Sequence, residues 1–157
     1  MSQTSVNLYQ SAAFKGMLAD LSDNDIISYA AEGAVNVGAT VKLGTNKEKQ
    51  VIESGTGAGA GALVVGFALH DHAREQSAAG LVNYANKETV STLKKGKLWV
   101  ETNDAVTAGA VANLHLATGK LTDEAVAAGI EAFTQVSVRF LTSTTGAGLA
   151  IVDVNPK

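Results

Sequence analysis

A glycine-rich stretch, Ser54–Gly66, is the first candidate for chemistry in this chain of 157 residues. It reads SGTGAGAGALVVG, and alternating glycines can cradle a phosphate when they lie between a strand and the N-terminus of a helix. Residues Gly55–Gly61 match the dinucleotide-binding pattern only with alanine in its last place, and the lysine of a Walker loop is missing. The residues that follow form a β-like apolar run. We therefore expect a hairpin loop between two strands, mobile in the free protein, with a nucleotide-binding enzyme as an alternative.

Two histidines at alternate positions, His70 and His72, are the second candidate. On a strand they would share one face and could begin a zinc or copper site. Asp71 would point to the other face, and His115 is the only other histidine of the chain. A solvated strand end accounts for the pair more simply, so we expect no metal and no cofactor. Because no Gly-x-Ser-x-Gly elbow marks a nucleophile either, we expect that the chain is not an enzyme.

The composition narrows the classes of partner. Hydrophobic residues make up 46% of the chain and charged residues 17%, and there is no cysteine. A formal net charge of −3 does not fit the basic surface of a nucleic-acid-binding protein. No apolar run approaches the roughly 18 residues that a membrane-spanning helix requires. We therefore expect neither nucleic acid nor a membrane as a partner.

Short runs of β-branched residues, separated by Gly, Asn, Asp and Thr, dominate the chain after residue 25. This pattern predicts an all-β fold, a compact barrel or sandwich of short antiparallel strands with little helix. The expected strands are Ile26–Ala30, Thr40–Leu43, Gln50–Glu53, Ala62–Leu69, Thr89–Leu93, Lys97–Glu101, Ala110–Leu116, Gln135–Leu141 and Leu149–Val154. Lys95 and Gly96 predict a tight hairpin between two of them, because glycine readily adopts positive φ. For residues 122–128 a two-turn helix and a loop both stay open.

The first 25 residues are polar, with a few apolar side chains. Phe14, Met17 and Leu18 follow helical spacing, which predicts a short amphipathic helix, and an extended arm pinned by these side chains is the alternative. We take residues 1–25 as an N-terminal arm and residues 26–157 as the β-rich domain.

The single tryptophan, Trp99, falls on the polar face of its expected strand. Two roles suit it there: intramolecular packing under lysine stems, or anchoring of an interface.

The order of segments along the chain resembles the structural cement, or decoration, proteins of tailed-phage capsids. The segments that carry the resemblance are Phe14–Asp20, Ile27–Gly33, Val37–Thr45, Val65–Asp71, Tyr84–Val100, Val106–Gly109, Gly119–Thr122 and Val138–Val152. They cover nearly the whole chain, and the most telling part is Thr89–Val100. The long glycine–alanine run is a departure from the family pattern.

The resemblance implies a virion structural protein, made in the host cytoplasm, that binds the outer surface of the capsid. It would stabilise contacts between capsomers of the major capsid protein. Similar proteins are β-rich homo-oligomers without catalytic residues, and we expect a trimer here, with a dimer as the alternative. We expect Phe14, Met17, Leu18 and Trp99 at the interface, the first three buried by a partner rather than by the domain's own core.

A different class also fits an all-β fold, namely a soluble ligand-binding barrel. Such a protein would be a monomer with a pocket lined by Phe67, Trp99 or Phe140.

Overall fold

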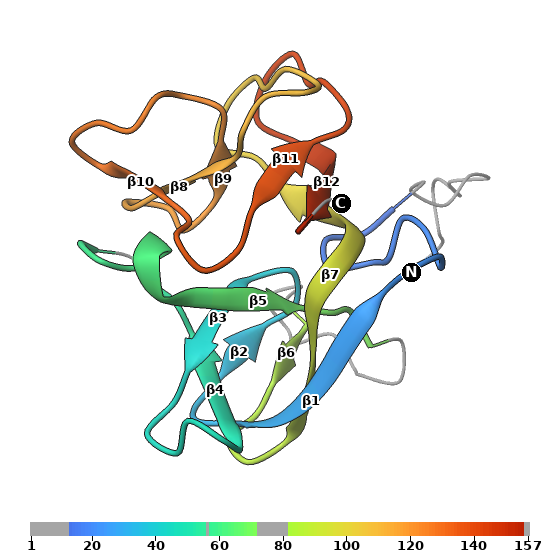
Figure 1. Cartoon of the computed structure of the whole chain (residues 1–157), viewed down its shortest axis with the longest axis vertical. Helices are drawn as coiled ribbons and strands as arrows, with labels where there is room; N and C mark the ends of the chain where they lie inside the picture. The colour runs from blue at the N-terminus through green and yellow to red at the C-terminus, as the bar shows by residue number, and fades with distance from the viewer. Residues whose placement is uncertain (1–12, 56, 72–81, 156–157) are drawn as a thin grey trace, which may run out of the picture.

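The computed structural model describes residues 13–55, 57–71 and 82–155, and almost every regular element in them is a β-strand (Figure 1). The exception is a short 3-10 helix, η1 (Gly61–Leu63). No α-helix forms at residues 122–128, where a helix and a loop were both open. The all-β prediction is confirmed. Within the described residues, no helix is long and apolar enough to span a membrane.

Five strands close into a small barrel in the order β1-β4-β3-β5-β7, and β7 pairs back with β1. The five are β1 (Asp25–Ala31), β3 (Thr40–Leu43), β4 (Gln50–Glu53), β5 (Val64–Ala68) and β7 (Thr89–Glu101). All neighbours are antiparallel except β1 and β4, which run parallel. A further short pair lies beside the barrel, formed by β2 (Val35–Asn36) and β6 (Asn83–Tyr84).

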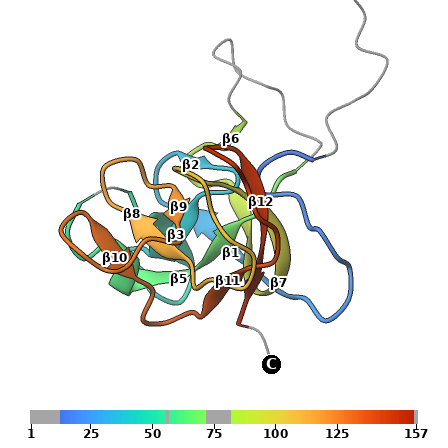
Figure 2. The same ribbon diagram turned by 90° about the horizontal axis from the view of Figure 1, so that it is seen from above.

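The second half of β7 continues out of the barrel into a C-terminal lobe. There it pairs with β12 (Leu149–Val154), which pairs in turn with β11 (Val138–Phe140). A three-stranded sheet completes the lobe, formed by β8 (Asn113–His115), β9 (Leu121–Thr122) and β10 (Ile130–Ala132). Seen from above, β11 and β12 lie beside β7, while β8 and β10 lie toward the other side of the lobe (Figure 2).

The hairpin predicted at Lys95–Gly96 is wrong, because β7 is one continuous strand of 13 residues. Its residues up to Lys95 pair with β1, and its residues from Gly96 onward pair with β12. Gly96 has a φ of +130°, and a Cβ at this position would lie 2.0 Å from the Asn24 side-chain oxygen. The glycine therefore marks the place where one strand passes from the barrel into the lobe, rather than a reversal of the chain.

The molecule has two buried clusters, and the second one, here called the C-terminal core, joins side chains of the barrel strands β5 and β7 to those of the lobe. The barrel core consists of small and β-branched side chains with one tyrosine: Ala31, Val35, Val37, Val41, Val51, Ala68, Tyr84 and Val90. The C-terminal core contains larger side chains, among them Phe67, Leu93, Leu98, Leu114 and Phe140. Strand β7 contributes to both clusters, since Val90 belongs to the first and Leu98 to the second.

Candidate binding surface

The N-terminal segment, residues 13–24 in the described structure, runs antiparallel along the second half of β7. The Gly16 amide donates to the Trp99 carbonyl at 2.7 Å, and the Trp99 amide donates to the Met17 carbonyl at 2.9 Å. The Ala19 amide donates to the Lys97 carbonyl at 2.9 Å. The segment is therefore neither an amphipathic helix nor detached from the domain. Residues 1–12 lie outside the described part, and the division at residue 25 stays a prediction.

Two glycines bring this segment against the barrel. Gly16 and Gly38 both have positive φ, and a Cβ at Gly16 would lie 2.7 Å from the Gly38 nitrogen. The Gly16 carbonyl accepts a hydrogen bond from the His70 amide at 2.8 Å. Since a side chain at either glycine would push the backbones apart, the sequence allows this contact only at glycine positions.

The four residues predicted for the interface differ in burial and in the groups that they contact. Leu18 pairs with Leu98 and packs against the C-terminal core, so the expectation that a partner alone buries it is wrong. Phe14 is 49% exposed and stacks on His70, with ring centroids 5.9 Å apart. Met17 and Trp99 are half-buried.

Met17 and Trp99 belong to a row of apolar side chains that crosses the outer face of the lobe. Alternation sets this face, because the flanking residues Leu98 and Val100 are buried in the core. Ile151 lies opposite Trp99 on β12, and the Leu141 amide donates to the Ile151 carbonyl at 2.8 Å. Residues opposite one another across strands share a face. We call Met17, Trp99, Ile151 and Leu141 the apolar row.

A second row of charged side chains runs parallel to the apolar row, and we call it the charged row. It consists of Asp20, Lys97, Asp153 and Arg139, in that order across the strands. The Lys97 ammonium lies 3.1 Å from the Asp20 carboxylate. The Ser22 backbone amide and the Lys97 side chain lower the pKa of Asp20 to about 2, so this carboxylate stays charged in mild acid.

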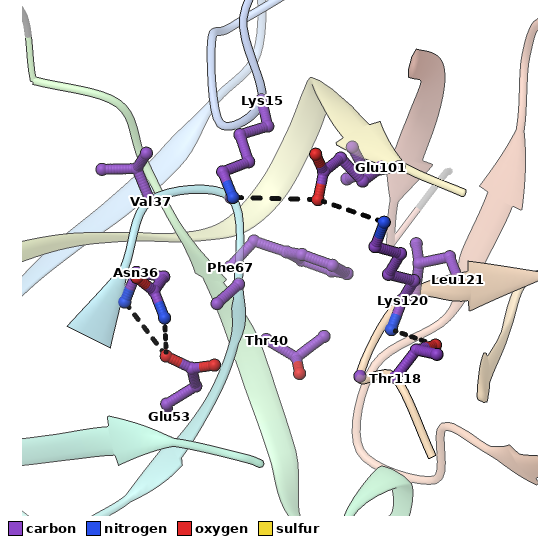
Figure 3. A pocket seen from close by; sticks show the side chains of 14 residues that line it. Lys15, Asn36, Val37, Thr40, Glu53, Phe67, Glu101, Thr118, Lys120 and Leu121 are labelled. Carbon is purple, nitrogen blue, oxygen red and sulfur yellow. Dashed lines mark hydrogen bonds and ion pairs between the residues drawn. The ribbon is translucent and has the colours of Figure 1, made fainter. Parts of the chain in front are cut away.

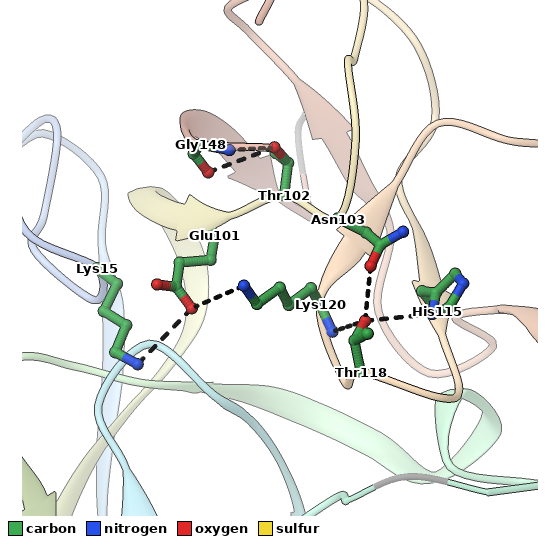
Figure 4. A network of polar contacts seen from close by, with 8 residues as sticks. All are labelled: Lys15, Glu101, Thr102, Asn103, His115, Thr118, Lys120 and Gly148. Atoms are coloured by element: carbon green, nitrogen blue, oxygen red, sulfur yellow. Dashed lines mark hydrogen bonds and ion pairs between the residues drawn. The ribbon is translucent and has the colours of Figure 1, made fainter. Parts of the chain in front are cut away.

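On its other side, the apolar row is bordered by Glu101 of β7, which lies opposite Leu149 of β12. Its carboxylate lies 3.7 Å from the Lys15 ammonium and 3.9 Å from that of Lys120 (Figure 4). Charged residues therefore border the apolar row on both sides, which is the arrangement of a polar rim around an interface centre.

A cavity of about 160 Å³ lies next to this carboxylate, between the barrel and the lobe (Figure 3). Two lysines and two glutamates line it, Lys15, Lys120, Glu53 and Glu101. Glu53 accepts hydrogen bonds from the backbone and side-chain nitrogens of Asn36, both at 3.0 Å. The formal charges of these four side chains sum to zero.

The backbone amides of the glycine loop do bind a negatively charged group, which is the Glu131 carboxylate of the same chain. The Gly59 amide donates to one carboxylate oxygen of Glu131 at 2.6 Å, and the Gly61 amide donates to the other at 3.0 Å. These amides are the groups that a phosphate would need. The expected hairpin is also wrong, because β3 lies between β4 and β5. The loop instead ties the barrel to β10 through Glu131, while the Gly57 amide donates to the Leu116 carbonyl and the Ala60 amide to the Gly57 carbonyl.

The histidine pair is only partly within the described structure. His70 is half-buried beside Phe14, and His72 lies outside the described residues. Among the residues that are described, no group of three or more His, Cys, Asp and Glu side chains is arranged for a metal ion.

Of the three aromatic residues considered for the pocket of a ligand-binding barrel, Phe67 lines the cavity beside Glu101 (Figure 3), whereas Trp99 and Phe140 do not. Phe67 and Phe140 are fully buried in the C-terminal core. Trp99 lies on the opposite, outer face of the sheet.

Sequence reasoning missed Ile151 and Leu141. A signal for Ile151 was present, since it is an apolar residue at the outward position of an alternating strand whose inward residues are Ala150 and Val152. Leu141 follows β11 and is 41% exposed. Nothing in its local sequence places it beside Ile151, because that neighbourhood depends on the pairing of β11 with β12.

Comparison with known proteins gives these surfaces a context. The family model described as "Structural cement protein (E217 gp24/Pam3 gp6)" matches residues 2–155. A chain from a solved structure, "The capsid of Myoviridae Phage XM1", superposes with a TM-score of 0.70 at 17% identity, covering 97% of this chain and 96% of that one. Among curated protein sequences, none matches. The chain belongs to the phage structural cement proteins, and its role is a structural, stabilising one in the capsid of the virion.

Proposed function

We propose that this cement protein binds the outer surface of the capsid and holds neighbouring capsomers of the major capsid protein together. The supporting observation is the N-terminal segment, which hydrogen bonds to β7 hold in place, with Phe14 49% exposed beside His70 and Met17 half-buried beside Trp99. A fixed segment loses little conformational entropy on docking, so its apolar contacts contribute more fully to affinity.

We further propose that the protein acts as a homo-oligomer, with a trimer expected and a dimer as the alternative. A shell presents many equivalent sites, and a symmetric oligomer that engages several of them gains avidity from contacts that are individually weak. Light scattering coupled to size-exclusion chromatography measures this directly, and a strictly monomeric protein at working concentrations contradicts the proposal.

The binding test uses capsids that lack the cement protein, with co-sedimentation of purified variants. Deletion of residues 1–20 is unsuitable, because residues 16–19 bond to β7 and belong to the fold. Met17→Glu and Phe14→Glu place a charge on the proposed contact and should weaken binding at least about tenfold. Val126→Glu is the matched control, since Val126 is 61% exposed between β9 and β10. Full binding by both Met17→Glu and Phe14→Glu would reject the N-terminal contact.

A further inference from the structure

We propose that the whole apolar row, including Ile151 and Leu141, docks on an uncharged, apolar strip of the major capsid protein. This inference rests on the proposed function and extends its contact from the N-terminal segment across two further strands. The row is continuous because each member is a cross-strand neighbour of the next, from Met17 through Trp99 and Ile151 to Leu141.

The position of the row argues against a purely structural explanation of its residues. In β7 and β12 the inward positions fill the C-terminal core, with Leu98, Val100, Ala150 and Val152 all at most 1% exposed. Trp99 and Ile151 occupy the outward positions of the same strands, where an unpartnered surface is usually polar. The row therefore places apolar side chains on the outer face, where the core does not need them.

The charges beside the row indicate the chemistry of the partner. In the charged row, Lys97 and Arg139 carry the same total charge as Asp20 and Asp153 with the opposite sign, and Lys97 is already paired with Asp20. Cross-strand pairing also places Asp153 between Lys97 and Arg139. On the other side of the row, Glu101 with Lys15 and Lys120 adds a formal charge of only +1. The face thus exerts little net attraction on a charged strip, although the whole chain carries a formal charge of −3. An apolar strip bordered by polar groups is the complementary surface.

The test separates this inference from the proposed function through the choice of residues. Leu141→Glu and Ile151→Thr alter only the part of the row that lies away from the N-terminal segment. Ile151→Thr keeps the β-branched shape, so it reduces apolar contact with little effect on the strand. We expect Leu141→Glu to weaken capsid binding about tenfold and Ile151→Thr about threefold, with Val126→Glu unchanged. Far-ultraviolet circular dichroism and thermal unfolding verify that each variant is folded.

A salt series gives a second readout of the same contact. Raising NaCl from about 0.05 M to about 0.5 M shortens the Debye length severalfold, which weakens charged interfaces and leaves apolar ones nearly unchanged. We expect the affinity of the wild-type protein to change less than about threefold over this range.

The outcomes are distinct. Normal binding by both Leu141→Glu and Ile151→Thr, together with loss in Met17→Glu, overturns the extended row and leaves the proposed function standing. If salt strongly weakens capsid binding, the proposal that the partner surface is apolar is wrong. Failure of the wild-type protein to bind capsids overturns the proposed function, and the docking of the row with it.

Discussion

The barrel and the C-terminal lobe are held together in different ways, although they share β7. The barrel closes on itself through its backbone ladder and encloses small side chains, so hydrogen bonding between its strands defines its shape. The strands of the lobe other than β7 and β12 have two or three residues each, too few for a stable ladder. The lobe depends instead on a core of large side chains and on side-chain hydrogen bonds. The surface proposed for binding lies in this half, on its two long strands β7 and β12 and on the segments beside them.

The largest expected effect comes from emptying the core of the lobe. Phe140 is fully buried, and Phe140→Ala should lower the free energy of unfolding by about 3–5 kcal/mol. Because β7 belongs to both cores, we expect hydrogen-exchange protection in the barrel to fall together with that of the lobe. Val41→Ala, in the barrel core, is the reciprocal variant and should lower protection in the lobe as well. Barrel amides that keep full protection in Phe140→Ala would show two independent folding units.

A smaller effect is expected where the glycine loop of the barrel meets the lobe. Glu131→Ala removes the acceptor of the Gly59 and Gly61 amides and should lower the free energy of unfolding by about 2 kcal/mol. Glu131→Gln keeps one acceptor oxygen and should cost about half as much in urea unfolding. Equal stability of Glu131→Ala and the wild-type protein would mean that the loop contributes nothing to the junction of the two halves.

The smallest effect concerns the ion pair that fastens the N-terminal segment to β7. The pKa of Asp20 is lowered from 3.8 to about 2, first by the Ser22 backbone amide and then by Lys97. A lowered pKa means that the contact stabilises the folded state above about pH 4 and that this contribution is lost as the pH falls toward about 2. Asp20→Asn should therefore be less stable than the wild-type protein near pH 6. The gap between the two proteins in urea unfolding should shrink steadily from about pH 4 to about pH 2 and close below that. A gap of constant size over this range contradicts the assignment.

Some of the fold was predictable because local pattern and burial agree. The strands at Thr40–Leu43, Gln50–Glu53 and Leu149–Val154 have the predicted bounds. In the last of these, alternate residues are buried in the core, which is the pattern that identifies a half-buried strand. The strands expected at Ala62–Leu69, Ala110–Leu116 and Gln135–Leu141 are shorter in the structure, since irregular backbone takes their ends.

The remaining features depend on residues distant in sequence. Gly96 suggested a turn because its neighbour Asn24 could not be known from the local sequence. The glycine loop suggested a ligand site, and the carboxylate that occupies it comes from a residue 72 positions beyond Gly59. Leu18 was expected outside the core because its pairing with Leu98 is a tertiary contact. Local pattern therefore indicates which residues are apolar, whereas strand pairing decides which face they occupy.

The course of β7 also determines how the molecule bears mechanical load. The N-terminal segment lies antiparallel along this strand, so tension along the segment loads its backbone hydrogen bonds in shear, all at once. Those bonds connect to Lys97 and Trp99, in the strand that also carries Val90 in the barrel core and Leu98 in the core of the lobe. A pull on the segment is consequently distributed over both halves of the molecule, as a chain that reinforces a shell requires.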